Sequence, residues 1–356
     1  MQAAEGARPG SARSLRRALW GLCVTELISW GVLYYTVPAT VPTLVAQTGW
    51  TATAIMTGFS CGLLASAAAA IPVGRLIDRY GPRWVMTGGS LLGTTSLALA
   101  ALASSPLAFG LAWLPAGVAM AALLYPPAFT ALTYWYGPRR SRALMTLTLV
   151  GGLASTVFAP LSGLLAAELG WRVTYVVLAA FLLATTGPIH LICLKLPCVA
   201  QTGRVRHDRH TRQVRTSRTF WLLTTALALA AFGLKASLTN LVPLLVERGL
   251  SAPTAAIFLG VAGAGQVLGR LVFPLLAGRT SPRRRDVIIL AAGAVSLAVL
   301  ALPPGLAGPL AAVALLTGGV CSRGRDRWVP RRVRVAGRRH RRRSSADPTH
   351  ARPHHP

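Results

Sequence analysis

Charge is scarce in this chain, and acidic charge is scarcest. Of its 356 residues only 13% are charged, with 9 Asp and Glu against 37 Lys and Arg, whereas 53% are hydrophobic and the mean hydropathy is +0.52. A soluble globular protein carries about twice that charged fraction. The composition therefore excludes a water-soluble domain and indicates a membrane protein.

The residue clusters of common enzyme and metal sites are also missing. The five cysteines have no metal-ligand spacing, and the sequence contains no HExxH motif, no paired carboxylates and no Cys/His cluster. We therefore expect no enzymatic activity, no cofactor and no metal. The cysteines are interpreted as apolar packing residues: Cys23, Cys61, Cys193, Cys198 and Cys321.

Apolar residues are present in long blocks of roughly 20, the length that crosses a hydrocarbon core of about 30 Å. The first block is too long for a cleavable signal peptide, so we expect none. The predicted spans are 18–45, 52–77, 85–104, 107–133, 143–167, 173–195, 219–246, 254–278, 286–303 and 307–320, of which the last is too short to cross.

Basic residues collect on one side of the predicted spans. If the N-terminus is cytoplasmic and the spans alternate, the inner connections before residue 320 hold 21 Lys or Arg, and the outer connections hold two, Arg172 and Arg248. This asymmetry follows the positive-inside rule. It accounts for much of the net charge of +28 without a nucleic-acid partner. We expect a multi-pass protein of the cell membrane with a cytoplasmic N-terminus.

A charged segment punctuated by glycine separates two of these spans. Residues 74–84 read Gly-Arg-Leu-Ile-Asp-Arg-Tyr-Gly-Pro-Arg-Trp. The segment resembles the loop between helices 2 and 3 of the major facilitator superfamily, Gly-x-x-x-Asp-Arg-x-Gly-x-Arg-Arg, with Trp84 at the last basic position. The matching residues, which form the expected gating loop, are Gly74, Asp78, Arg79, Gly81 and Arg83.

The resemblance implies a secondary active transporter that works by alternating access. In that family the loop Asp interacts with the positive end of a facing helix and with nearby Arg, and so holds the cytoplasmic side shut. Asp78 and Arg79 take that role by position. Residues 134–152, with an aromatic pair before basic residues and then glycines, also resemble the monocarboxylate and oxalate/formate porters.

The sequence repeats itself weakly after 200 residues. The shift places Gly49 on Gly249 and residues 81–83 on 281–283. Tandem copies are how the two six-helix halves of this superfamily are arranged. The resemblance therefore implies an all-α membrane fold of two pseudo-symmetric bundles, the second incomplete, with about nine or ten of twelve transmembrane helices.

The apolar sequence ends at Val320, partway along the expected helix 10, and the remainder is rich in Arg. We expect a truncated chain whose tail is read out of frame. The expected segments are an N-terminal arm at 1–17, the first bundle at 18–195, a cytoplasmic linker at 196–218, part of the second bundle at 219–320 and an Arg-rich disordered tail at 321–356.

Ionisable side chains inside the spans point to function, because a charge in hydrocarbon is costly unless it faces a cavity or a partner. Glu26 and Arg270 lie at similar depths, so we expect them to meet across the two halves, whereas Lys235 lies deeper. A structural hydrogen bond from Glu26 to Thr57 or Ser60 is the alternative. Glu26 is the candidate protonatable group.

Other polar residues complete the candidate substrate and coupling site. The monocarboxylate porters carry an Asp four residues before an Arg on helix 8, and here Gln266 precedes Arg270 at that spacing. An Arg suits a carboxylate substrate. We expect His190 to snorkel or to cap its helix. The further residues expected to line the cavity are Tyr34, Tyr35 and Asn240.

Together these features predict a transporter of small organic anions such as monocarboxylates, coupled to protons. Its expected partners are a small-molecule substrate and the lipid bilayer, and it is expected to be a monomer. Two alternatives stay open: an exporter of drugs or metabolites, and a truncated remnant that does not transport.

Overall fold

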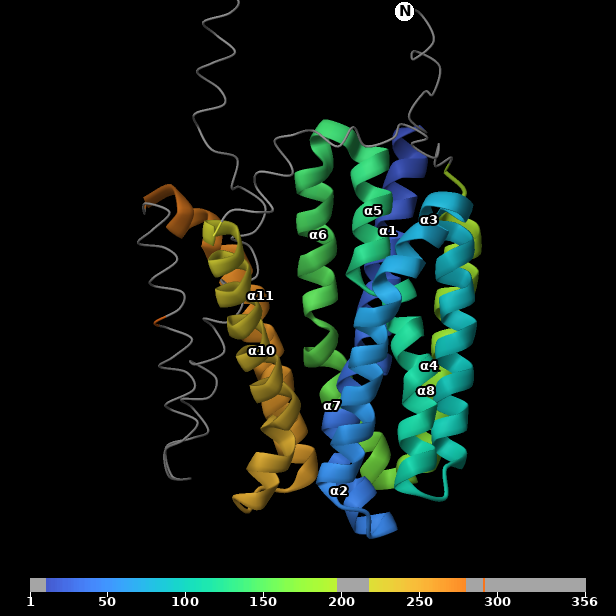
Figure 1. Ribbon diagram of the computed structural model, residues 1–356, viewed down its shortest axis with the longest axis vertical. Coiled ribbons are helices and arrows are strands. Elements are labelled where there is room, and N and C mark those ends of the chain that lie inside the picture. Colours follow the sequence, from blue (N-terminus) through green and yellow to red (C-terminus); the bar gives the residue numbers. More distant parts are fainter. Residues whose placement is uncertain (1–10, 197–217, 280–290, 292–356) are drawn as a thin grey trace, which may run out of the picture.

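The computed structural model describes residues 11–196, 218–279 and 291, and within them it is helical without strands (Figure 1). The elements are α1 (Ala12–Trp30), the π-helical turn η1 (Gly31–Tyr35), α2 (Thr36–Thr48), α3 (Ala52–Leu102), α4 (Pro106–Leu123), α5 (Tyr125–Tyr136), the 3-10 turn η2 (Gly137–Arg139), α6 (Arg140–Gly152), α7 (Ala154–Leu169), α8 (Trp171–Cys193), α10 (Arg218–Glu247) and α11 (Ala252–Arg279).

The described helices have the length and surface of membrane-spanning segments. Five helical stretches are long and apolar enough to cross a bilayer, at Ala12–Thr48, Ala52–Leu102, Pro106–Leu169, Trp171–Cys193 and Ala252–Gly269. Large apolar side chains lie exposed along their outer faces, as lipid contact requires. Examples are Leu64 at 70% and Leu107 at 73% exposure.

Helix α3 contains two crossings joined by a sharp turn. Its 51 residues would measure roughly 77 Å if straight, more than twice the hydrocarbon thickness. The break is at Gly81, whose φ of 79° and ψ of 163° suit glycine but not residues with a Cβ. The segment 74–84, predicted as a loop, is therefore helical on both sides of one glycine.

The first crossing changes its helical geometry halfway. Gly31–Tyr35 form a π-turn, and the Thr36 hydroxyl donates a hydrogen bond to the Gly31 carbonyl at 3.3 Å. Pro38 lacks the N–H that would bond to the Tyr34 carbonyl, which favours an irregular turn just before it. Such π-turns are concentrated at functional sites. Trp30, at the end of α1, lies midway between Ala12 and Thr48.

The predicted repeat is visible where α2 meets α3 and where α10 meets α11. Gly49 has a φ of 72° and Gly249 a φ of 94°, both in the left-handed region that favours glycine. Thr51 and Ser251 follow, and each side chain accepts a hydrogen bond from the backbone N–H three residues later, at 3.2 and 3.4 Å. The same glycine turn and helix cap thus recur 200 residues apart.

Helices α10 and α11 pack against the first half mainly at one end. Helix α10 contacts α2, and α11 contacts mainly α7 and to a smaller extent α2 and α6. Both α2 and α7 follow the breaks in their crossings. Figure 1 shows their lower ends close to α2 and α7, while their upper ends diverge from α6. A Cβ added to Gly163 of α7 would lie 2.7 Å from the Cβ of Ala256, so only small residues allow this close approach.

Several predicted segments lie outside the described residues. They are the arm up to residue 10, the linker from 197 to 217, the span at 286–303 apart from residue 291, the span at 307–320, and the tail at 321–356. The other predicted spans match described helices within a few residues, and two are interrupted at Leu124 and Leu153. Pro126 and Pro127 stand in the first turn of α5, which restarts the helix after Leu124.

Candidate functional site

A lysine of α10 lies on two aromatic rings of the first crossing. The Lys235 Nζ is 4.8 Å from the ring centroid of Trp30 and 4.6 Å from that of Tyr34. Both distances fall in the range of cation–π attraction, which contributes about 0.5–2 kcal/mol each. Because Trp30 is at the middle of its crossing, this places a cation deep in the membrane, between the two halves of the chain.

More aromatic rings surround this lysine contact. Trp30 lies 5.1 Å from Tyr125 of α5, and Tyr125 stacks on Phe129 at 5.2 Å with an interplanar angle of 20°. Tyr34 meets Phe59 of α3 edge-on at 5.6 Å. We call Trp30, Tyr34, Tyr125 and Phe129, together with Lys235, the aromatic–lysine site.

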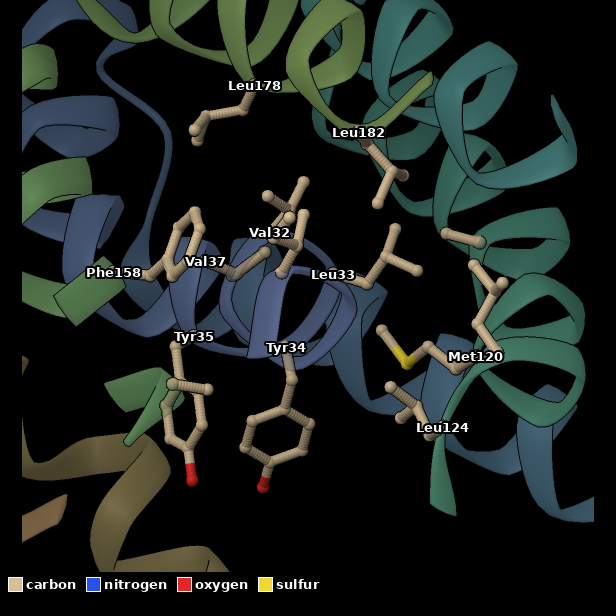
Figure 2. Close-up of a cluster of buried hydrophobic side chains, with 14 of the residues drawn as sticks. Val32, Leu33, Tyr34, Tyr35, Val37, Met120, Leu124, Phe158, Leu178 and Leu182 are labelled. Carbon is tan, nitrogen blue, oxygen red and sulfur yellow. The ribbon is translucent and has the colours of Figure 1, made fainter. Parts of the chain in front are cut away.

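The π-turn sets the direction of the tyrosines. Tyr34 and Tyr35 are consecutive, yet Figure 2 shows both hydroxyls pointing away from Leu178 and Leu182, while Val32 packs with those leucines. The two rings are 5.1 Å apart and nearly perpendicular. The turn thus separates an apolar packing face from a face that carries hydroxyl groups.

Thr239, rather than the predicted Asn240, joins α10 to this face. The Thr239 hydroxyl donates to the Lys235 carbonyl, so its oxygen remains free to accept from the Tyr34 hydroxyl, at a long 3.5 Å. Asn240 is exposed and donates to the carbonyl of Ala236 in its own helix, at 2.9 Å. Of the predicted cavity residues, the structure therefore brings together Tyr34, Tyr35 and Lys235 but not Asn240.

Glu26 lies one helical turn before Trp30 and is completely buried. Neither carboxyl oxygen has a hydrogen-bond partner among the described residues. The Trp30 indole and the Cys23 thiol are close enough to interact with it electrostatically. The alternative hydrogen bond to Thr57 or Ser60 is wrong: both hydroxyls are on exposed residues of α3, and Thr57 donates to its own helix.

Gln266 is separate from the aromatic–lysine site, on α11. It is buried, and its Nε2 has no hydrogen-bond partner within the described chain. One turn earlier, Gly263 lies against the hydroxyls of Ser155 and Thr156 on α7, which are also buried and have no hydrogen-bond partner in the part of the chain that the structure describes. Arg270 follows on α11, but its side chain is outside the described residues, so its pairing with Glu26 stays a prediction.

His190 belongs to a buried polar contact between α3 and α8. Its Nδ1 is 3.1 Å from the Ser90 hydroxyl oxygen, and the Thr186 hydroxyl donates to the same oxygen at 2.8 Å. His190 has no exposed surface. The prediction that it snorkels or caps its helix is therefore wrong, because a partner on α3 holds the ring inside the bundle.

The predicted gating residues surround the turn within α3. Asp78 and Arg79 are exposed, and the described residues offer no hydrogen bond or ion pair to the Asp78 carboxylate. Arg83 lies over the ring of Trp84 at 4.9 Å, so the residue that departs from the family pattern still contacts a neighbouring cation. An added Cβ at Gly74 would meet no atom within 4 Å.

Sequence reasoning missed Trp30, Tyr125 and Thr239. Two signals were available in the sequence: Trp30 precedes Tyr34 by one helical turn, and Thr239 follows Lys235 by one turn. Tyr125 stands directly before the Pro126–Pro127 pair, where a helix must restart. The contacts of Trp30 with Lys235 and Tyr125, and of Thr239 with Tyr34, depend on long-range packing and had no sequence signal.

Comparison with known proteins gives the family of this fold. Residues 22–324 match the Major Facilitator Superfamily. Human monocarboxylate transporter 11 is 31% identical over 222 residues, which cover 60% of this chain and 46% of the relative. Rat monocarboxylate transporter 3 is 28% identical over 213 residues, with 57% and 43% covered. The chain thus spans about half the length of the curated relatives it matches.

Solved structures share the fold at low sequence identity. A bacterial homolog of the human lysosomal transporter Spinster, inward-facing and unoccupied, has a TM-score of 0.67 at 18% identity, with 88% of this chain and 75% of that chain covered. The nucleoside transporter NupG has a TM-score of 0.63 at 15% identity, with 86% and 79% covered. The chain is a multi-pass membrane protein with a transporter fold, and it belongs to the major facilitator superfamily.

Proposed function

We propose that this protein is a secondary transporter of small organic anions, with Lys235 as the anchor for the anionic group. The observation that carries the proposal is the placement of Lys235 against Trp30 and Tyr34, at mid-membrane and between the two halves. Substrate sites of secondary transporters lie near the midplane at the interface of their repeats. A cation there selects for negative charge.

The surroundings of Lys235 support an anion rather than a cation as substrate. An ammonium group over two aromatic faces keeps its charge partly compensated while the site is empty. A carboxylate replaces that weak contact with a charge-assisted hydrogen bond, which is stronger. The similarity to monocarboxylate transporters agrees with this chemistry.

Glu26 is the proposed coupling group. It is a completely buried carboxyl without a hydrogen-bond partner among the described residues, and it interacts with Trp30, which also contacts Lys235. A carboxyl that gains and loses a proton there would change the charge around the substrate anchor. We propose that proton binding at Glu26 accompanies anion movement, with Arg270 and Gln266 as further candidate residues on α11.

The arrangement of the helices supports alternating access. Helix α10 contacts α2 and helix α11 contacts mainly α7, while the ends of both helices on the side of the N-terminus diverge from α6 (Figure 1). With a cytoplasmic N-terminus, this is an inward-facing arrangement. The Asp78 carboxylate, without a partner in the described chain, agrees with an open cytoplasmic side. We propose that the protein works as a monomer in the cell membrane.

The anchor is tested by binding to the purified chain in lipid nanodiscs. Lys235→Met should weaken the binding of radiolabelled benzoate and pyruvate about 10- to 100-fold, because a hydrogen bond to a charged group contributes about 1.5–3 kcal/mol. Lys235→Arg should keep most of the binding. Unchanged affinity in Lys235→Met would contradict the proposal.

Transport itself is tested in proteoliposomes that contain a pH-sensitive dye. An inward gradient of the bound acid should move protons into the vesicles at a rate that saturates with acid concentration. A signal that equals that of protein-free vesicles would contradict the proposed transport by this chain.

A further inference from the structure

The aromatic–lysine site offers more than a cation. Lys235 alone would suffice for a short aliphatic acid, yet three half-buried aromatic rings, Trp30, Tyr125 and Phe129, extend away from it. Trp30 contacts both Lys235 and Tyr125, so the aromatic surface starts at the ammonium group itself. The proposed anion transport leaves this surface unused.

The backbone is built to present these rings. Tyr34 and Tyr35 lie on one side because of the π-turn, and Tyr125 begins α5 directly after the break at Leu124. Gly151 of α6 gives Tyr125 its space, because an added Cβ would lie 2.8 Å from the Tyr125 hydroxyl oxygen. The π-turn, the break at Leu124 and the space left by Gly151 therefore together determine how these aromatic rings are placed.

The geometry of the ring contacts determines which substrates bind more tightly to this aromatic surface. Aromatic rings attract one another in offset-stacked or edge-to-face arrangements, in addition to the apolar area that they bury. The ring contacts in the site already have these forms: Trp30 meets Tyr34 edge-on at 5.3 Å, and Tyr125 stacks on Phe129. A saturated chain of the same size would bury similar area without the ring–ring attraction.

We infer that the transported anion is an aromatic monocarboxylate, with its carboxylate at Lys235 and its ring against Trp30 and Tyr125. This inference rests on the proposed anion transport and narrows its substrate class. Carboxylate and ring lie close together in such a molecule, as the ammonium group and the indole do in the site. A short aliphatic acid would gain no ring–ring attraction from these aromatic side chains.

The test compares three probes of similar size in a binding assay on the chain in nanodiscs. Benzoate carries a ring and a charge, cyclohexanecarboxylate carries the charge without aromaticity, and benzamide carries the ring without charge. Benzoate should compete with radiolabelled benzoate at about tenfold lower concentration than either of the others.

Variants of the rings separate stacking from simple packing. Tyr125→Leu and Trp30→Leu should reduce the preference for benzoate over cyclohexanecarboxylate, whereas Tyr125→Phe and Trp30→Phe should keep it and also control for folding. Tyr134→Leu, on the exposed side of the same helix α5, should leave the preference unchanged.

The outcomes distinguish the two proposals. Equal, Lys235-dependent binding of benzoate and cyclohexanecarboxylate would overturn the aromatic inference and leave the anion proposal standing. Equal binding of benzoate and benzamide would contradict the anion proposal, because the ring alone would then account for binding. Binding of none of the three would contradict both.

Discussion

Ser155 and Ser162 lie two turns apart on α7, and both are buried, but among the described residues only Ser162 has a hydrogen-bond partner. Its hydroxyl is 3.2 Å from that of Thr36, whereas the Ser155 hydroxyl, facing Gly263 of α11, has none among the described residues. An unpaired buried polar group costs about 1–3 kcal/mol. The packing of α7 on α11 must therefore outweigh the free-energy cost of burying the Ser155 hydroxyl.

This difference predicts opposite effects of the same substitution. Ser155→Ala should stabilise the protein by about 1 kcal/mol, because it removes the unpaired group. Ser162→Ala should destabilise it by about 0.6–1.7 kcal/mol, the range for interhelical hydrogen bonds in membranes. Unfolding by SDS titration in detergent micelles measures both. Equal destabilisation by the two variants would mean that Ser155 has a partner in the folded protein.

The contact between Ser90 and His190 is tested by comparing alanine substitutions of two serines of α3, Ser90 and Ser96. Ser90→Ala would leave His190 and Thr186 without their shared oxygen, at a cost of about 1–3 kcal/mol. Within the described helices Ser96, buried on the same helix, bonds only to the Leu92 carbonyl, so Ser96→Ala should cost much less. The same SDS titration compares them. A larger loss in Ser96→Ala would show that the Ser90 contact contributes little.

The proposed coupling role of Glu26 is tested by the substitution Glu26→Gln. Glu26→Gln keeps the size and hydrogen-bonding capacity of the acid but cannot release a proton, so it should abolish pH-dependent uptake and leave counterflow exchange intact. Glu168→Gln, at an exposed position near the end of α7, is the control and should leave the pH dependence unchanged. Proton-driven uptake that survives Glu26→Gln would remove Glu26 from the mechanism.

The close approach of α7 and α11 predicts intolerance to larger residues at Gly163. Its added Cβ would lie 2.7 Å from the Ala256 Cβ, so Gly163→Val forces the helices apart, at about 1–3 kcal/mol of overpacking. Gly88→Val introduces the same side chain on α3, where an added Cβ meets no atom within 4 Å. Thermal unfolding midpoints should fall only for Gly163→Val. Equal midpoints for both variants would show that α7 and α11 can move apart at this contact without loss of stability.

Much of the fold could be predicted from the sequence, because apolar blocks set the spans and a glycine with its helix cap repeats at residues 49 and 249. The orientation of individual helices could not. Asn240 and Thr239 are neighbours in sequence, but their side chains diverge by about 100° around a helix, so the rotation of α10 against the turn η1 decides which one meets Tyr34.

Two further features were not predicted from the sequence. The π-turn at Gly31–Tyr35 changes which residues share a face, and a pattern based on 3.6 residues per turn does not contain it. The burial of His190 depends on Ser90, which is 100 residues away in the sequence. Depth in the membrane alone suggested snorkelling, and only the packing of α3 on α8 supplies the partner.

The central claim, that an aromatic anion binds at Lys235 between the two halves, is tested most directly by a crystal structure with 4-iodobenzoate. The anomalous signal of iodine locates the ring independently of the protein phases. We predict the iodine peak beside Trp30 and Tyr125, with the carboxylate in hydrogen-bond contact with the Lys235 Nζ. An iodine peak elsewhere in the membrane region, with Lys235 still resting on Trp30 and Tyr34, would contradict the account.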